Sequence, residues 1–125
     1  MQQLASKAYG QVEKRTASER QIELALFQQI TQALIDIDRT EQPAPSDWAD
    51  AIHRNLQLWT TLTVDLAQPA NALPDDLKRS LIFISEFVRR HSQQVLAGDA
   101  ELADLIEVNQ SIMGGLAGQP NAESV

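Results

Sequence analysis

Apolar residues recur with the period of an α-helix in the segment SERQIELALFQQITQALIDID, residues 18–38. One stripe along this segment is formed by Ile22, Leu26, Ile30, Ala33 and Ile37. A spacing of three and four residues places such side chains on one face of a helix. Ser18 comes before the stripe and has a side chain suited to an N-cap. The pattern therefore predicts a long amphipathic helix.

A second helical pattern covers residues 46–66, although part of it favours a strand by local propensity. The run TTLTV at 60–64 is rich in β-branched residues, which are enriched in strands. The helical stripe consists of Trp48, Ile52, Leu56, Trp59 and Leu66. Because this stripe spans the whole segment and the β-branched run is short, the pattern favours a helix. We expect Thr60, Thr61 and Val64 on its outer face.

Two further helices follow, each with its own start or stop signal. Pro74 opens the first, because proline suits a first helical turn and the following Asp75 and Asp76 favour the positive end of the helix dipole. Its apolar stripe is Leu77, Leu81, Ile84, Val88, His91 and Val95, and Gly98 stands where a C-terminal cap is expected. The last helix starts near Asp99. Its apolar face comprises Leu102, Leu105, Ile106, Ile112, Met113 and Leu116.

The opening residues carry a weaker pattern. A narrow stripe of Leu4, Ala8, Tyr9 and Val12 is interrupted by Gly10 and predicts a short or frayed helix. The loop at 41–47 is too short to separate domains. We therefore expect an all-α protein: a single compact bundle of about five helices with short proline-containing loops over residues 1–116, followed by a mobile tail at 117–125.

Composition narrows the possible settings of this 125-residue chain. It has no cysteine, and its first residues lack the basic start and apolar run of a secretory signal. Charged residues interrupt every apolar stretch before the roughly 20 residues that a bilayer requires. We expect a cytoplasmic protein without membrane insertion. The net charge of −7 argues against DNA binding, because nucleic acids are bound mainly through neutralised phosphates.

The search for catalytic chemistry finds no convincing group. Asp50 and His53 can reach one metal ion, but a di-metal bundle needs glutamate donors on other helices, and a surface ion pair is the favoured interpretation. His91 lies on an apolar stripe beside Phe87, which is typical of a packed histidine with one hydrogen-bonded nitrogen. No zinc, phosphate-loop or catalytic-triad motif occurs. We expect a non-enzymatic protein without metal or cofactor.

The helix predicted at 18–38 carries apolar residues on more than one face. Leu24 and Ile35 lie roughly opposite the main stripe, and Phe27 and Leu34 widen it. Such a helix is either central in the bundle or lines a groove for a partner, and we favour the groove. Two amides, Asn55 and Asn109, stand within apolar stripes. If buried, they require hydrogen-bond partners, either from a neighbouring helix or from a ligand.

The helix that follows Pro74 carries a basic strip made of Lys78, Arg79, Arg89 and Arg90. Because eleven residues return a helix to nearly the same angle, Lys78 lies in line with Arg89, and Arg79 lies in line with Arg90, on the outer face. The two members of each pair are about 16 Å apart along the helix axis. A solvated surface is the ordinary interpretation. The strip is also the place where an acidic partner or an RNA backbone can dock, and the neighbouring Ile82 and Phe83 form a second candidate apolar contact.

Three runs of sequence resemble a known family: LWTTLTVDLAQPANALP at 58–74, EFVRRHSQQVLAG at 86–98 and IEVNQSIMGGL at 106–116. Together with Ala8, Tyr9 and the segment 19–31, they resemble the FlaF family of flagellar biosynthesis regulators, cytoplasmic proteins of alphaproteobacterial type. The resemblance covers nearly the whole chain.

The resemblance implies a role in making and exporting flagellin, the filament protein. FlaF-type proteins are associated with promoting flagellin synthesis, with opposing a translational repressor of flagellin and with acting as a flagellin secretion chaperone. A chaperone for a helical substrate needs an apolar groove and no catalyst, which agrees with the pattern above. The alternative is a regulator that acts on flagellin messenger RNA, directly or through the repressor, although an RNA-binding protein usually carries more positive charge.

Overall fold

The structure, a computed structural model, describes residues 24–116 and shows four helical segments within them. The first covers residues 24–39, and it is followed by α2 (Pro45–Leu66), α3 (Asp75–Leu96) and α4 (Leu102–Leu116). The all-α class and the bundle are confirmed, with four described helices instead of about five. The opening helix, the Ser18 cap and the tail at 117–125 lie outside the described residues.

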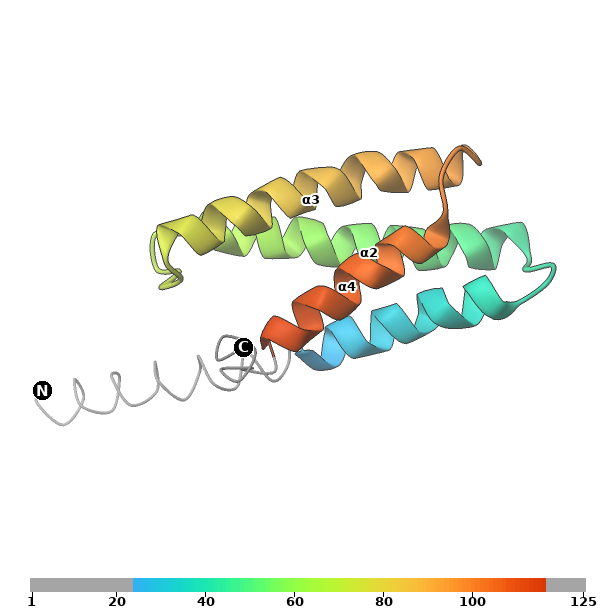
Figure 1. The fold of residues 1–125 in the computed structure, drawn as a ribbon, viewed down its shortest axis with the longest axis horizontal. Helices are drawn as coiled ribbons and strands as arrows, with labels where there is room; N and C mark the ends of the chain where they lie inside the picture. The colour runs from blue at the N-terminus through green and yellow to red at the C-terminus, as the bar shows by residue number, and fades with distance from the viewer. Residues whose placement is uncertain (1–23, 117–125) are drawn as a thin grey trace, which may run out of the picture.

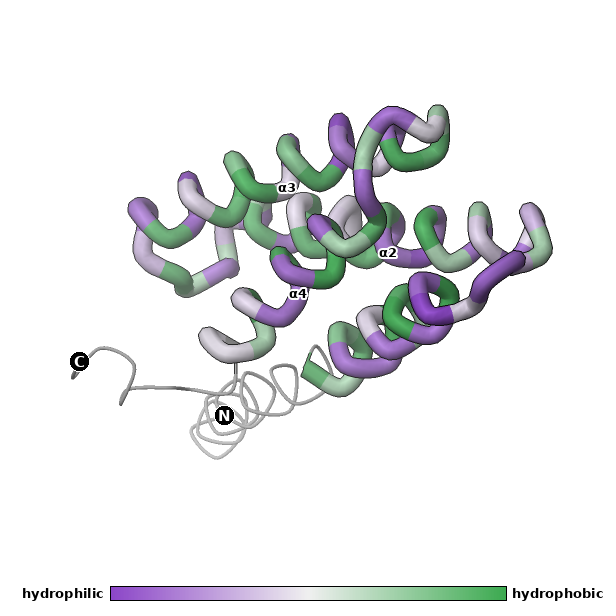
Figure 2. Tube along the Cα trace, turned by 45° about the vertical axis from the view of Figure 1, so that its right-hand side comes forward, coloured by the Kyte–Doolittle hydropathy of each residue, from purple (hydrophilic) through white to green (hydrophobic). Residues whose placement is uncertain are grey.

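Helix α2 occupies the middle of the bundle (Figure 1). The helix at 24–39 lies on one side of it and α3 on the other, while α4 crosses over α2 between them. Polar and apolar residues alternate along each helix in the manner of amphipathic helices (Figure 2). Among residues 24–116, no helix is long and apolar enough to cross a membrane.

The ends of the helices follow the expected chemistry. Helix α2 begins at Pro45, one residue before the predicted start, and α3 begins directly after Pro74 with Asp75 and Asp76 in its first turn. Gly98 has a φ of 83°, in the left-handed region that glycine adopts without strain, and it terminates α3 as predicted. The β-branched run is helical, with Val64 exposed on the outer face.

The core brings together one side of every helix. Its buried apolar members include Phe27, Leu34, Ala51, Ile52, Trp59, Val88, Val95, Leu102 and Leu105. Two aromatic rings form its centre, because Phe27 and Trp59 meet edge to face with their centroids 5.6 Å apart. These contacts join the first described helix to α2.

The buried face of the helix at 24–39 differs from the predicted stripe. Phe27 and Leu34 are 1% and 0% exposed, whereas Leu26, which was assigned to the core stripe, is 41% exposed. Ile30 belongs to the predicted stripe and is also buried in the structure. The helix is therefore rotated so that the residues expected to widen the stripe form its centre. The cause is the edge-to-face contact with Trp59, which holds Phe27 inward.

A buried polar cluster joins three helices inside this core. Asn109 of α4 accepts a hydrogen bond from Trp59 Nε1 at 2.9 Å. It donates from Nδ2 to Thr31 Oγ1 at 3.0 Å and to Asn55 Oδ1 at 2.7 Å. All four side chains are buried. The two amides predicted to need partners therefore satisfy each other in part, and Asn109 is the hub of the cluster.

The connection between α2 and α3 is organised by Asn71. Its Nδ2 donates to Asp65 at 3.2 Å, its Oδ1 accepts the Leu73 amide at 3.0 Å, and its backbone carbonyl accepts Lys78 Nζ at 2.8 Å. A hydrogen bond of 2.6 Å between Thr63 and Ser85 joins the two helices beyond the turn. The distinctive sequence block at 58–74 thus builds a rigid corner.

Replacing Asn71 by alanine is expected to lower the free energy of unfolding by about 1–2 kcal/mol, because two side-chain hydrogen bonds of the corner are lost together. Urea titration followed by circular dichroism measures the change. Gln93→Ala, at an exposed position of α3, is the matched control and is expected to remain within about 0.5 kcal/mol of the wild type. Equal stability of the two variants would contradict a structural role for Asn71.

Candidate binding groove

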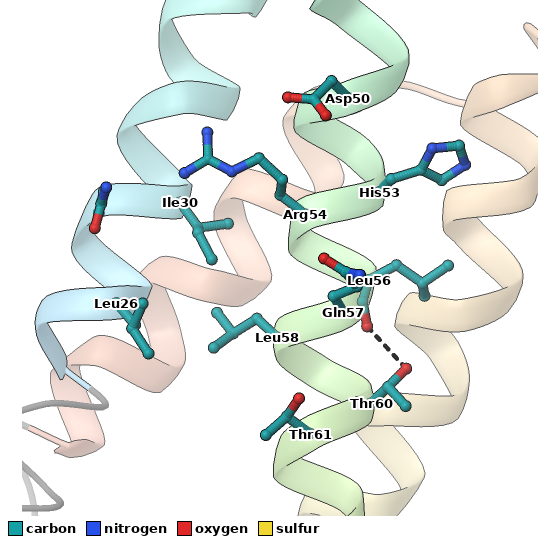
Figure 3. A pocket seen from close by; sticks show the side chains of 11 residues that line it. Leu26, Ile30, Asp50, His53, Arg54, Leu56, Gln57, Leu58, Thr60 and Thr61 are labelled. Carbon is teal, nitrogen blue, oxygen red and sulfur yellow. Dashed lines mark hydrogen bonds between the residues drawn. The ribbon is translucent and has the colours of Figure 1, made fainter.

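An open groove of about 860 Å³ runs between the helix at 24–39 and α2 (Figure 3). Its lining residues are Leu26, Gln29, Ile30, Asp50, His53, Arg54, Leu56, Gln57, Leu58, Thr60 and Thr61. It opens between two helices that are consecutive in the chain and joined by the short loop at 40–44. The lining comes mainly from α2, with Leu26, Gln29 and Ile30 contributed by the first helix, so the groove offers an extended and open surface.

The apolar part of the groove comes from both walls. Leu26 and Ile30 face it from the first helix, and Leu58 faces it from α2 (Figure 3). Thr60 also lines it, and its hydroxyl donates to the Leu56 carbonyl at 2.9 Å within the same helix. Because that hydroxyl already has a backbone partner, an apolar ligand does not leave it unsatisfied.

One cation stands above the apolar part. Arg54 is half-buried, and its guanidinium extends from α2 across the groove toward the first helix (Figure 3). Within residues 24–116 it forms no ion pair, whereas Arg79, Arg89 and Arg90 each do. The groove thus combines an apolar wall with a guanidinium group, which is a suitable partner for an acidic group of a ligand.

The predicted apolar site residues separate into three groups. Phe27 and Leu34 belong to the closed core and offer no surface to a partner. Leu24 and Ile35 are half-buried, so they are neither core residues nor fully open anchors. Ile82 and Phe83 are exposed on α3, outside the groove lining. The structure therefore does not bring the six residues into one site.

The groove residues Leu26 and Leu58 were missed as binding candidates for different reasons. Leu26 matched the period of the predicted core stripe, so sequence spacing placed it inside. Leu58 precedes the buried Trp59 and was not part of any stripe. The available signal was the excess of apolar positions on both consecutive helices, which exceeds what one narrow core face requires.

The basic strip on α3 is largely engaged within the chain. Lys78 is bonded to the Asn71 carbonyl, Arg79 forms an ion pair with Asp76, and Arg89 donates to both carboxylate oxygens of Glu86. The Arg89 hydrogen bond holds the pKa of the Glu86 carboxyl below its usual range. Lys78 is thus held in the α2–α3 corner, whereas Arg79, Arg89 and Arg90 form exposed pairs that contribute little and leave these cations open to exchange.

The two histidines have different surroundings. His91 is mostly buried, its Nε2 lies 2.8 Å from Asp104 Oδ2 of α4, and its ring stacks on Phe87 with the centroids 4.8 Å apart. This agrees with the predicted packed histidine. His53 and Asp50 are both exposed, and the expected ion pair between them is not formed (Figure 3). Within residues 24–116, no three potential metal-ligating side chains cluster.

Fold and groove together define a small helical-bundle protein with an open groove between two consecutive helices. The family model described as flagellar protein FlaF matches residues 5–116, which is most of the chain. The chain therefore belongs to the FlaF family of flagellar proteins. A search of curated proteins and a search of solved structures found no match to the chain.

Proposed function

We propose that this protein binds unassembled flagellin in the cytoplasm as a secretion chaperone, and that it promotes flagellin synthesis and export without catalysing a reaction. Membership of a flagellar family supports the setting. The observation that carries the proposal is the open apolar groove between the helix at 24–39 and α2, with Leu26 exposed on its wall. An amphipathic helix buries its apolar face well in such a groove.

The mode of binding follows from the shape and chemistry of the groove. A flagellin helix lying between the two walls packs apolar residues on Leu26, Ile30 and Leu58. A carboxylate on the same helix then pairs with Arg54. The helical termini of flagellin, which assemble the filament core, are the natural ligand segments. An effect on translation follows indirectly, through flagellin itself or through the translational repressor.

Calorimetric titration with monomeric flagellin tests the proposal. The wild type is expected to bind, and Leu26→Asp is expected to weaken binding by about 30-fold or more, because an apolar anchor is replaced by a charge. Val64→Asp is the matched control, since Val64 is an exposed apolar residue of α2 outside the groove lining. It is expected to bind like the wild type.

Two results would contradict this proposal. The first is the absence of heat at high micromolar concentrations of both folded proteins, which would exclude flagellin as a ligand. The second is an equal effect of Leu26→Asp and Val64→Asp, which would place the flagellin site outside the groove. Circular dichroism of each variant establishes that the comparison is made between folded proteins.

A further inference from the structure

The outward face of α3 carries an exposed stripe with an ordered arrangement of charge. It consists of Asp76, Arg79, Phe83, Phe87 and Arg90, all exposed. Phe83 is 74% exposed and Phe87 is 39% exposed. At 3.6 residues per turn, offsets of four and seven residues on either side of Phe83 return to the same side of the helix. The five residues therefore form one stripe centred on Phe83.

This stripe faces away from the rest of the bundle. Helix α3 packs on its neighbours through Val88, Ser92 and Val95, which are buried on its opposite side. In Figure 1 it forms the outer edge of the bundle, with α2 and α4 on one side only. Phe83 and Phe87 together form an exposed apolar patch with charged residues at both ends, and such patches mark interaction surfaces.

The arrangement of the stripe is self-complementary. Asp76 and Arg90 each stand seven residues from Phe83 on opposite sides, and Arg79 and Phe87 each stand four residues away. When the helix is turned end for end about Phe83, Arg90 takes the position of Asp76, and Phe87 takes the position of Arg79. An antiparallel second copy therefore places a base opposite the acid and an aromatic ring opposite the arginine. Both exchanges bring attractive partners together, because guanidinium groups pair with carboxylates and also stack on aromatic faces.

We propose that two copies of this chain associate through α3, with the helices antiparallel and a two-fold axis at Phe83. Asp76 of each copy then meets Arg90 of the other copy, Arg79 lies over the Phe87 ring, and the two Phe83 side chains meet at the axis. A two-fold interface uses the same patch on both copies, which is what a self-complementary stripe provides. The groove between residues 24–39 and α2 stays open in both copies.

Charge complementarity favours an antiparallel second copy of the chain over a parallel one. A parallel alignment places Asp76 against Asp76 and Arg90 against Arg90, which is repulsive. The present intrahelical ion pairs do not prevent the exchange, because Asp76, Arg79 and Arg90 are highly exposed and such pairs contribute little. A contact made by one helix of 22 residues is small, so the dimer is expected in concentration-dependent equilibrium with the monomer.

Sedimentation velocity over a range of protein concentrations tests the association. The wild type is expected to move from monomer to dimer as its concentration rises. Phe83→Ala is expected to raise the dissociation constant by about 30-fold, since a central aromatic side chain is lost from both copies. Ile82→Ala, at an adjacent exposed apolar residue on the flank of the stripe, is the matched control and is expected to dimerise like the wild type.

A charge exchange tests the antiparallel alignment. Arg90→Asp alone and Asp76→Arg alone are each expected to weaken the dimer by about tenfold or more, because like charges then meet at both ends. An equimolar mixture of these two variants is expected to form a heterodimer, since every acid again faces a base. The double variant Asp76→Arg with Arg90→Asp is expected to regain wild-type association.

Three outcomes would overturn the proposal. One is a wild type that stays monomeric at the highest concentration reached. Another is a mixture of Arg90→Asp and Asp76→Arg that associates no better than either variant alone. The third is a Phe83→Ala variant that sediments like the wild type but loses flagellin binding, which would assign this face to flagellin.

Discussion

Replacing Asn109 by alanine is expected to lower the free energy of unfolding by about 2–4 kcal/mol, although no apolar contact of large area is removed. Asn109 accepts the indole N–H of Trp59 and donates to Thr31 and Asn55. All of these groups are buried, so water does not replace the lost partner. The cost therefore exceeds that of a single exposed hydrogen bond, and urea-induced unfolding measures it.

Gln110→Ala is the control for this experiment, because Gln110 is the exposed neighbour of Asn109 on the same helix. It is expected to change stability by less than about 0.5 kcal/mol. Trp59→Phe combined with Asn109→Ala in a double-mutant cycle is expected to be less than additive, because both changes remove the same hydrogen bond. Strict additivity, or a loss below 1 kcal/mol for Asn109→Ala, would contradict the role of Asn109 as hub.

The second large effect concerns two leucines on the helix at 24–39. Leu34→Asp is expected to abolish the cooperative thermal transition, because Leu34 is fully buried and an unpaired carboxylate in that position costs several kcal/mol. Leu26→Asp is expected to keep the transition, since Leu26 already contacts solvent along the groove. Thermal melts followed by circular dichroism at 222 nm separate the two outcomes.

The contrast between these variants also tests the observed rotation of the helix. If the predicted stripe with Leu26 inside were the true core face, Leu26→Asp would unfold the protein and Leu34→Asp would be better tolerated. Ile35→Asp and Leu24→Asp are expected to fall between the two, because both side chains are half-buried. This order of stabilities distinguishes core positions from groove positions on one helix.

If both proposals hold, the protein presents two separate surfaces. The groove beside α2 takes a helix of flagellin, and the outward face of α3 joins a second copy. A dimer then carries two flagellin sites, and each remains accessible because the interface lies on the other side of α2 from the groove (Figure 1).

The sequence by itself determined which segments are helical and where several of them end. A stripe that continued through residues 46–66 outweighed the strand propensity of Thr60 and Thr61, since burial of a whole helix face is worth more than local preference. Pro74 and Gly98 placed the ends of α3 because their backbone restrictions act locally. These features depend on neighbours in the chain, which the sequence contains.

Which side of the helix at 24–39 faces inward was decided only by the tertiary structure, whereas the stripes predicted on α2, α3 and α4 already contained buried residues such as Trp59, Val88 and Leu105. On the helix at 24–39, apolar residues occupy several faces, and their spacing alone does not select between Leu26 and Phe27. The edge-to-face contact of Phe27 with Trp59 and the hydrogen bond from Asn109 to Thr31 select the buried side. Both contacts join residues far apart in sequence, so no local pattern contains them.

Long-range contacts also explain why the observed candidate sites differ from the predicted ones. Four basic residues on α3 suggested a free cationic strip, but the structure gives Lys78 to the α2–α3 corner and Arg89 to Glu86. The groove needs the outer sides of two helices to meet at a set distance, which packing against Trp59 and α4 determines. The sequence therefore determined the helices and the core positions of α2, α3 and α4, whereas long-range contacts between side chains decided the buried side of the helix at 24–39 and the position of the groove.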